Sequence, residues 1–166
     1  MEQDNENHRD QLEKEYWEPV GRFIFAFGDL ERLVDEFLID LLGIDYRIAG
    51  KFTLSEIDFL ARANLLKAFC RGTAAEKEMK EVVTEIEQLN TFRNRLIHGT
   101  WSAHFESTEG NTHFHKIGVS RQHRVHTFNF SVGDIQNNRM KLEVLKKRLG
   151  AAALHVLAQR VDADGK

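Results

Sequence analysis

The chain of 166 residues has little cysteine, little proline and no long apolar run. Its single cysteine, Cys70, excludes an internal disulfide. Uninterrupted stretches of 18 apolar residues, which a membrane-spanning helix needs, are missing. The first 22 residues are rich in charge, whereas a secretory signal has an apolar centre. We therefore expect a cytoplasmic chain that does not span a membrane.

The composition is that of a folded protein, with 42% hydrophobic residues and 12 phenylalanines. A chain of this length corresponds to one domain with one core. We predict a single domain over 1–166, with polar tails at 1–18 and 158–166.

Charge is distributed unevenly around a net charge of −3. Residues 1–60 carry 6 basic and 15 acidic side chains, and residues 61–166 carry 17 basic and 11 acidic ones. A polyanion such as RNA would therefore meet the second part of the chain. The alternative is that the two parts attract each other within the fold.

The scarcity of proline and the 3.6-residue spacing of apolar positions predict long helices. Pro19 fits the first turn of a helix that ends at Gly43, after a polar tail and a short helix holding Leu12 and Tyr16. Thr53 with Glu56 forms a capping-box pattern for a second helix that ends at Gly72. Ile57, Leu60, Asn64 and Ala68 lie along one face of this predicted helix.

A second capping-box pattern, Thr73 with Glu76, predicts a third helix that ends near His98, with Gly99 as its terminator. From Trp101 the apolar period changes to two, which predicts a strand over 101–106 and two more around 114–119 and 125–130. Ser131 with Asp134 then begins a last helix. Its apolar positions are Ile135, Leu142, Leu145, Leu149, Ala152 and Val156.

These elements predict a mainly α protein. We expect an up-and-down bundle of about four long helices, with a small antiparallel β meander over 101–130 inserted before the last helix.

The third predicted helix places an arginine within its apolar stripe. On a helical wheel Arg93 falls among Val82, Ile86, Leu89 and Leu96. Burying a cation without an anionic partner costs several kcal/mol, roughly, so an anion is expected to meet it. Asn90, Asn94 and His98 form an adjoining polar strip.

The segment Phe92-Arg93-Asn94-Arg95-Leu96-Ile97-His98-Gly99 resembles the signature of the HEPN superfamily. That signature is an arginine, a polar residue, and a histidine four to six residues beyond the arginine. Arg93, Asn94 and His98 match it, and the long helix that carries them matches the helical bundle of the family. The predicted meander departs from a minimal bundle.

The resemblance implies a metal-independent endoribonuclease, often a toxin, that acts as a homodimer with two motifs facing a shared cleft. It implies no cofactor and no metal, an RNA substrate, and a cognate antitoxin or nucleotidyltransferase as candidate partner. Arg93, Asn94 and His98 would be the catalytic residues, with Asn94 in a positioning role.

The chemistry of these residues fits RNA cleavage through the 2′-hydroxyl. Such cleavage needs a group that titrates near neutrality and a cation that stabilises charge on phosphorus, which are roles for histidine and arginine. Arg93 and His98 are about 140° apart on an ideal helix. Either the helix unwinds at Gly99, or a second protomer supplies one of the groups.

The structural alternative is an arginine held by a buried carboxylate and a histidine that only ends a helix. Glu31, within the apolar arc of the first long helix, could pair with Arg93. We treat Glu31 and Asn90 as supporting residues.

Four more residues are candidate RNA contacts: Arg95, Trp101, Arg121 and Arg124. A hairpin register could place His104 and His115 on one face, as a zinc site would require. No cysteine accompanies them, and surface histidines are common on strands, so we predict no metal site. Two other functions stay open: metal-dependent hydrolysis, and a non-catalytic module that binds a nucleotide or a protein.

Overall fold

The structure is a computed structural model. It describes the backbone of residues 2–44, 54, 56–98, 100–108, 111–119 and 125–164. Side chains are described for 14–44, 54, 56–98 and 130–159. The helices are α1 (Glu2–Leu42), α3 (Phe59–Phe69), α4 (Glu76–Ile97) and α5 (Val132–Asp164), and the strands are β1 (Thr100–Thr108), β2 (Asn111–Val119) and β3 (Val125–Ser131).

The chain divides into two compact units. The first unit comprises Met1–Phe27 and Thr91–Lys141, and the second comprises Gly28–Asn90 and Leu142–Lys166. The division falls inside α1, α4 and α5, so each of these helices has residues in both units. The prediction of a single domain stays a prediction.

The first unit contains an aromatic cluster from three elements. Phe92 of α4 contacts Phe23 of α1 and Phe130 of β3 edge to face, with ring centroids 5.2 and 5.5 Å apart. Edge-to-face packing is the favoured arrangement of aromatic rings. The cluster therefore fixes the last turns of α4 within this unit. Other buried side chains here are Tyr16, Val20, Ala26, Phe27, Leu96 and Ile135.

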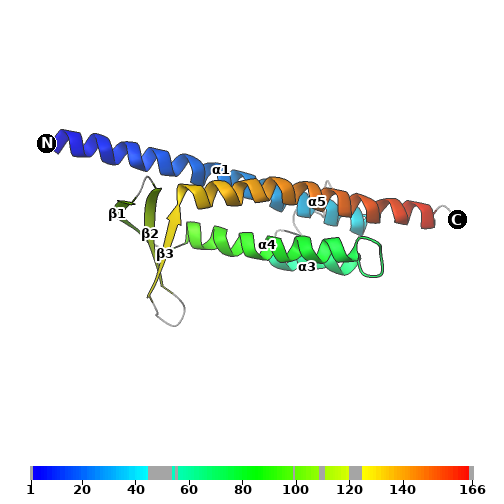
Figure 1. Ribbon diagram of the computed structural model, residues 1–166. Helices are drawn as coiled ribbons and strands as arrows, with labels where there is room; N and C mark the ends of the chain where they lie inside the picture. Colours follow the sequence, from blue (N-terminus) through cyan, green and yellow to red (C-terminus); the bar gives the residue numbers. More distant parts are fainter. Residues whose placement is uncertain are drawn as a thin grey trace. The chain divides into compact units, whose positions relative to one another are not determined.

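The strands form one antiparallel sheet in the order β1–β2–β3. Ser102 lies opposite His115 and Glu106 opposite His113, with an irregular register between Ser102 and Glu106. Phe114 lies opposite Phe130. β3 leads directly into α5 (Figure 1).

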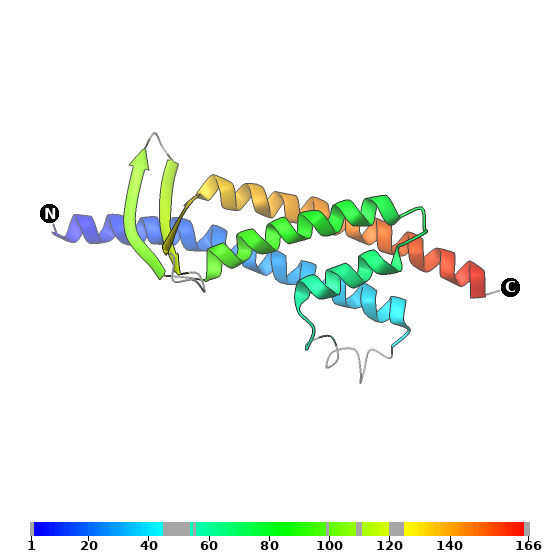
Figure 2. The ribbon, with the colours of Figure 1, turned by 90° about the horizontal axis from the view of Figure 1, so that it is seen from below.

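The second unit is a helical bundle, and the predicted mainly helical bundle is confirmed. α3 and α4 form a helical hairpin (Figure 2). Lys146 of α5 pairs with Asp29 of α1, at 3.8 Å. Across α3 and α1, Arg62 pairs with Asp35. The buried side chains come from all four helices and include Leu30, Val34, Leu38, Ala63, Leu66, Met79, Val82, Ile86, Leu142, Leu145 and Leu149.

Several predicted helix signals are confirmed. The six apolar positions predicted for the last helix are all buried. Ser131 and Asp134 form the predicted capping box: the Ser131 amide donates to the Asp134 carboxylate (2.9 Å), and the Asp134 amide donates to the Ser131 hydroxyl (3.0 Å). Gly43 and Gly72 have positive φ angles, as expected of helix terminators.

The predicted start of the first long helix is wrong. The structure has one helix from Glu2 to Leu42 with Pro19 inside it, where we expected a tail and a new helix at Pro19. A proline inside a helix costs about 3 kcal/mol. Tyr16, Val20 and Phe23 are all buried, at helical spacing across the proline. Burial of this continuous stripe offsets the cost.

The second predicted helix starts later and buries another face. α3 begins at Phe59, where Asp58 caps it by accepting a hydrogen bond from the Leu60 amide at 2.9 Å. Thr53 lies outside the described residues. The buried positions of α3 are Phe59, Ala63 and Leu66. Ile57, Leu60 and Asn64, on the face that the sequence traced, are half-buried, and Ala68 is exposed. A face with phenylalanine and leucine buries more apolar surface than one that contains an asparagine.

Two smaller corrections concern element ends. α5 continues to Asp164, through most of the predicted C-terminal tail. β1 continues to Thr108 and β2 begins at Asn111, beyond the predicted strand ends at 106 and 114. Among the described helices, none is long and apolar enough to cross a membrane.

Candidate functional site

The candidate site is carried by the last two turns of α4, in the first unit. Phe92 and Leu96 hold this segment: Phe92 packs between Phe23 and Phe130, and Leu96 is buried. Between them stand Arg93 and Asn94, both half-buried. His98 follows the last helical residue, and its amide donates to the Asn94 carbonyl at 3.0 Å.

Arg93 is oriented by two neutral groups. Its guanidinium carbon lies 5.8 Å from the centre of the Phe27 ring, which is the geometry of a cation–π contact. Its Nη1 donates a hydrogen bond to the Asn94 side-chain oxygen at 3.1 Å. Among the side chains described in this unit, these are the contacts of the guanidinium. Its positive charge is therefore not neutralised by a carboxylate there.

Arg93 is half-buried, whereas the sequence predicted a buried side chain. Its neighbours on the predicted stripe, Val82, Ile86, Leu89 and Leu96, are buried as expected. A planar, half-exposed guanidinium with further N–H donors can bind a phosphate oxygen pair.

His98 is exposed at the C-terminal end of α4. The structure thus places Arg93 and Asn94 together, and His98 one turn further on.

The other predicted site residues are only partly placed. Glu31 and Asn90 are half-buried and belong to the second unit, so the predicted pairing of Glu31 with Arg93 stays a prediction. Arg95 is exposed on α4. Trp101 is in β1 without a described side chain, and Arg121 and Arg124 lie outside the described residues.

Sequence reasoning missed Phe27, which is buried on α1 and supports the Arg93 guanidinium. The contact joins residues of two different helices that lie far apart along the chain, and helical periodicity alone does not pair them.

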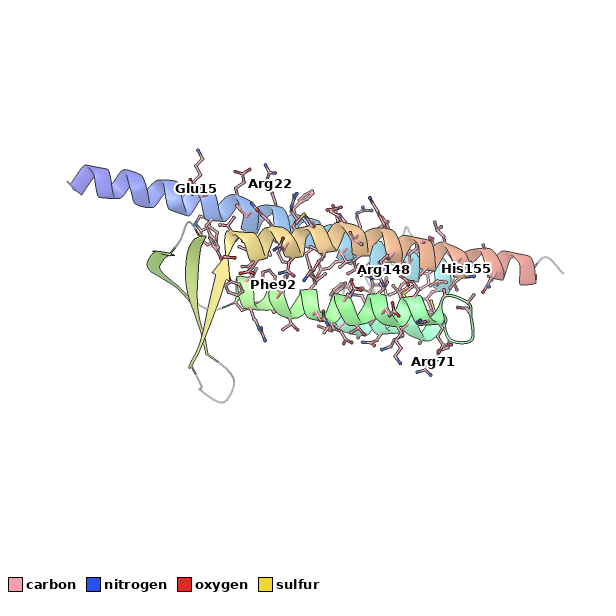
Figure 3. All side chains as sticks on the ribbon, in the orientation of Figure 1. Glu15, Arg22, Arg71, Phe92, Arg148 and His155 are labelled. Carbon is pink, nitrogen blue, oxygen red and sulfur yellow. The ribbon has the colours of Figure 1, made fainter. Side chains whose placement is uncertain are left out.

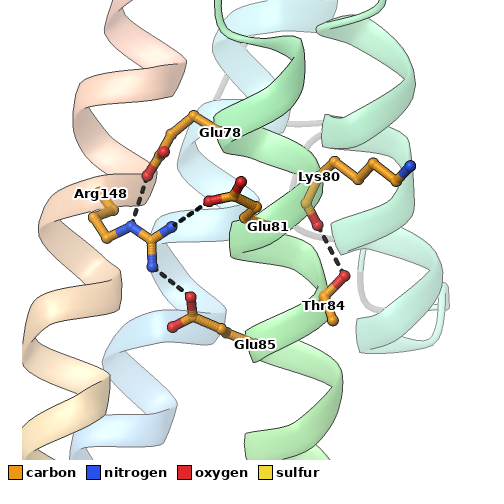
Figure 4. Close-up of polar contacts among 6 residues, drawn as sticks. All are labelled: Glu78, Lys80, Glu81, Thr84, Glu85 and Arg148. Atoms are coloured by element: carbon orange, nitrogen blue, oxygen red, sulfur yellow. Dashed lines mark hydrogen bonds and ion pairs between the residues drawn. The ribbon is translucent and has the colours of Figure 1, made fainter.

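The second unit contains a polar cluster of another kind. Arg148 of α5 donates to Glu78 (2.6 Å) and to Glu85, and lies 3.4 Å from Glu81, all on α4 (Figure 4). Hydrogen bonds to Glu78 and Glu85 raise the pKa of Arg148 above its usual value, so it stays charged. This cluster joins two helices of the bundle.

A shallow hollow of about 470 Å³ lies beside this cluster, lined by Lys77, Lys80, Glu81, Thr84 and Glu85. Its walls carry both signs of charge, and Glu85 is already bound to Arg148. Within the side chains that the structure describes, no three histidine, cysteine or acidic groups gather as metal ligands. The side chains of His104 and His115 are outside that set.

Comparison of the chain with protein-family models, with curated proteins and with solved structures finds no match.

Proposed function

We propose that the chain is a metal-independent endoribonuclease of the HEPN type that cuts RNA through its 2′-hydroxyl. The observation that carries the proposal is the state of Arg93, whose guanidinium is held by an aromatic ring and a neutral amide. Within the described side chains of its unit, such an arrangement orients a cation without a carboxylate partner, as binding of an anionic ligand requires. The fold that belongs to this proposal is the up-and-down bundle with an antiparallel meander before the last helix.

Each residue of the motif has a role in this proposal. Arg93 contacts the phosphate and stabilises its added charge, His98 transfers the proton, and Asn94 positions the guanidinium. No cofactor takes part. The biological setting would be a cytoplasmic toxin of a toxin–antitoxin or defence system, with an antitoxin or a nucleotidyltransferase as partner.

The spacing of Arg93 and His98 makes a homodimer part of the proposal. The two residues point about 140° apart on an ideal helix, so one α4 does not direct both at one phosphate. A second protomer can supply the missing group. Unwinding of the chain after Ile97 is the other route.

The test is RNA cleavage in the presence of a chelator. We expect Arg93→Ala and His98→Ala each to lower the cleavage rate by roughly 10² or more, the range of a lost acid–base or charge-stabilising group. Arg71→Ala and His155→Ala are matched controls, because both residues are exposed and lie in the second unit (Figure 3). Full activity of both motif variants would exclude the nuclease.

A second candidate is a non-catalytic module that binds a nucleotide or a protein. The half-buried Arg93–Asn94 pair favours it, because these two residues can bind an anion without the exposed His98. The two candidates differ in cells. If expression inhibits growth and His98→Ala restores it, the nuclease is supported, whereas equal growth of both clones supports the module.

A further inference from the structure

The first unit exposes two large aromatic side chains on one face of α1. Phe25 is 76% exposed and Trp17 is 49% exposed. They stand four residues to either side of Gly21, which is also exposed. Exposed aromatic groups about two turns apart on one side of a helix are typical of protein interfaces. We name Trp17, Gly21 and Phe25 the outer face of α1.

We propose that the outer face of α1 binds the same face of a second copy of this chain, with the two helices antiparallel. Trp17 and Phe25 lie at equal distances along α1 from Gly21, one on each side. A two-fold axis through Gly21 therefore brings Trp17 level with Phe25 of the partner subunit, at both ends of the contact. A self-complementary patch of this kind is what an isologous dimer requires.

Gly21 allows the two helices to approach closely. A Cβ atom placed on it would meet no heavy atom within 4 Å apart from its chain neighbours and the adjoining backbone of α1, so no other described segment covers this point. The distance between packed helices depends on the side chains at the crossing point, and glycine gives the shortest one. The two aromatic pairs can then pack on either side of the crossing.

The charges beside the outer face select the antiparallel second copy as the occupant. Glu18 and Arg22 are exposed, lie along one edge of this face and form an ion pair at 2.5 Å. Arg22 points outward from α1 (Figure 3). The two-fold axis brings the edge that carries Glu18 and Arg22 against the same edge of the second copy. Glu18 then comes near Arg22 of the partner subunit, and Arg22 comes near Glu18 of the partner subunit. A parallel pair would bring opposite edges together and lose both contacts.

Exposed ion pairs contribute little affinity but fix orientation, while aromatic side chains contribute most of the binding energy. Phe25 and Trp17 are therefore the expected anchors. The acidic Glu18 argues against an anionic lipid surface as the occupant.

This contact is independent of the proposed ribonuclease. Phe27, which contacts Arg93, lies about 120° around α1 from Gly21 at 100° per residue. A dimer through the outer face leaves the motif uncovered. If the motifs also face each other across a second two-fold axis that intersects the first at a right angle, the two contacts together give a closed tetramer.

The first experiment measures the mass of the full chain in solution by light scattering. We expect Phe25→Ser to halve the mass at micromolar concentration, from dimer to monomer or from tetramer to dimer. Met140→Ser is the control, because Met140 is 55% exposed on α5 and lies outside the outer face of α1. A monomeric natural chain, or equal masses of the chain and of Phe25→Ser, would overturn the proposal.

The second experiment tests the antiparallel order by charge reversal. Glu18→Arg and Arg22→Glu should each weaken self-association, since like charges then meet. Mixing the two variants should restore the mass, because the arginine introduced in one variant then meets the glutamate introduced in the other across the contact. Intrachain effects on α1 cannot be repaired by mixing, so a mixture that stays dissociated contradicts the antiparallel contact.

The third experiment tests the crossing point. Gly21→Cys should form a disulfide-linked dimer on oxidation, because the two copies of this position adjoin the axis. Gly28→Cys is the matched control, as its two copies would be roughly 21 Å apart at 1.5 Å rise per residue. The natural Cys70 is buried. Equal cross-linking of both variants would contradict the proposed crossing point. If instead the chain is a monomer that binds vesicles, and Phe25→Ser abolishes this binding, a lipid surface is the occupant of the outer face of α1. Unchanged RNA cleavage by Phe25→Ser keeps the two proposals separate.

Discussion

Residue 94 is the hydrogen-bond partner of the Arg93 guanidinium, so its charge should affect the proposed binding of an anion. The Asn94 oxygen accepts a hydrogen bond from the guanidinium at 3.1 Å, and both groups are half-buried. In Asn94→Asp a carboxylate would occupy this place and neutralise the arginine. A hydrogen bond to a charged group is worth about 1.5–3 kcal/mol, so we expect RNA binding to weaken by roughly tenfold or more.

A fluorescence titration with labelled RNA measures this loss. Asn137→Asp, at an exposed position on α5, adds the same charge elsewhere and serves as the control. Equal binding by both variants would mean that Arg93 does not contact the RNA.

The place of Arg93 on the apolar stripe of α4 could be predicted from the sequence, and its tertiary contacts could not. The apolar stripe of α4 predicted that Arg93 lies beside Leu89 and Leu96, because both sit at helical spacing along one segment. The ring of Phe27 comes from another helix, and the Phe130 ring that fixes Phe92 comes from a strand. Such contacts depend on tertiary packing, which a single sequence pattern does not specify.

Tyr16 should make the folded protein less stable at alkaline pH. It is 2% exposed, and burial raises the pKa of its hydroxyl well above the usual value. In the unfolded chain a tyrosine ionises near pH 10, roughly, while the folded chain keeps the proton. The free energy of unfolding should therefore fall as the pH rises above that value, by up to about 1.4 kcal/mol per pH unit.

Urea denaturation at a series of pH values compares the natural chain with Tyr16→Phe. The natural chain should lose stability more steeply above about pH 10, where a free tyrosine ionises. The other tyrosine, Tyr46, is present in both chains, so its ionisation cancels. Parallel curves would show that Tyr16 titrates normally when folded.

At the scale of elements, two glycines respond in opposite directions to the same substitution. Gly72 has a φ angle of +73° at the end of the α3 segment, where an alanine is strained. Gly28 lies inside α1 with no heavy atom within 4 Å of a built Cβ. We expect Gly72→Ala to destabilise the fold by about 1 kcal/mol and Gly28→Ala to stabilise it by up to about 1 kcal/mol.

Thermal unfolding of the two variants provides the measurement. A loss of stability in Gly28→Ala would mean that this position is covered in the protein in solution. A neutral Gly72→Ala would mean that the turn after α3 does not need a left-handed residue.

Element boundaries were predictable where a side chain itself makes the cap. Ser131 and Asp134 form the box that their spacing predicted, and Gly43 ends α1 as expected. The prediction at Pro19 was wrong, because it considered only the local preference of proline for a helix start. Burial of Tyr16 and Val20 on either side stabilises a continuous helix through this position. Local propensity is a weak signal when a continuous apolar stripe opposes it.

At the scale of the whole molecule, the two units are joined by helices that both contain. α1, α4 and α5 each have residues on both sides of the division. Ending a helix at the division would leave up to four amides and four carbonyls without intrahelical bonds. Unfolding one unit alone would therefore disrupt three helices at once, which favours a single cooperative transition.

Arg148 tests this cooperativity, because it lies in the second unit while both tryptophans, Trp17 and Trp101, belong to the first. Arg148→Ala removes one cation from among Glu78, Glu81 and Glu85, and should destabilise the bundle by roughly 1 kcal/mol at low salt and less at high salt. In a cooperative protein the midpoint of tryptophan fluorescence must shift as far as that of far-ultraviolet circular dichroism. Lys147→Ala, an exposed cation on the same helix, should shift neither. If Arg148→Ala lowers the dichroism midpoint and leaves fluorescence unchanged, the two units unfold separately despite their shared helices.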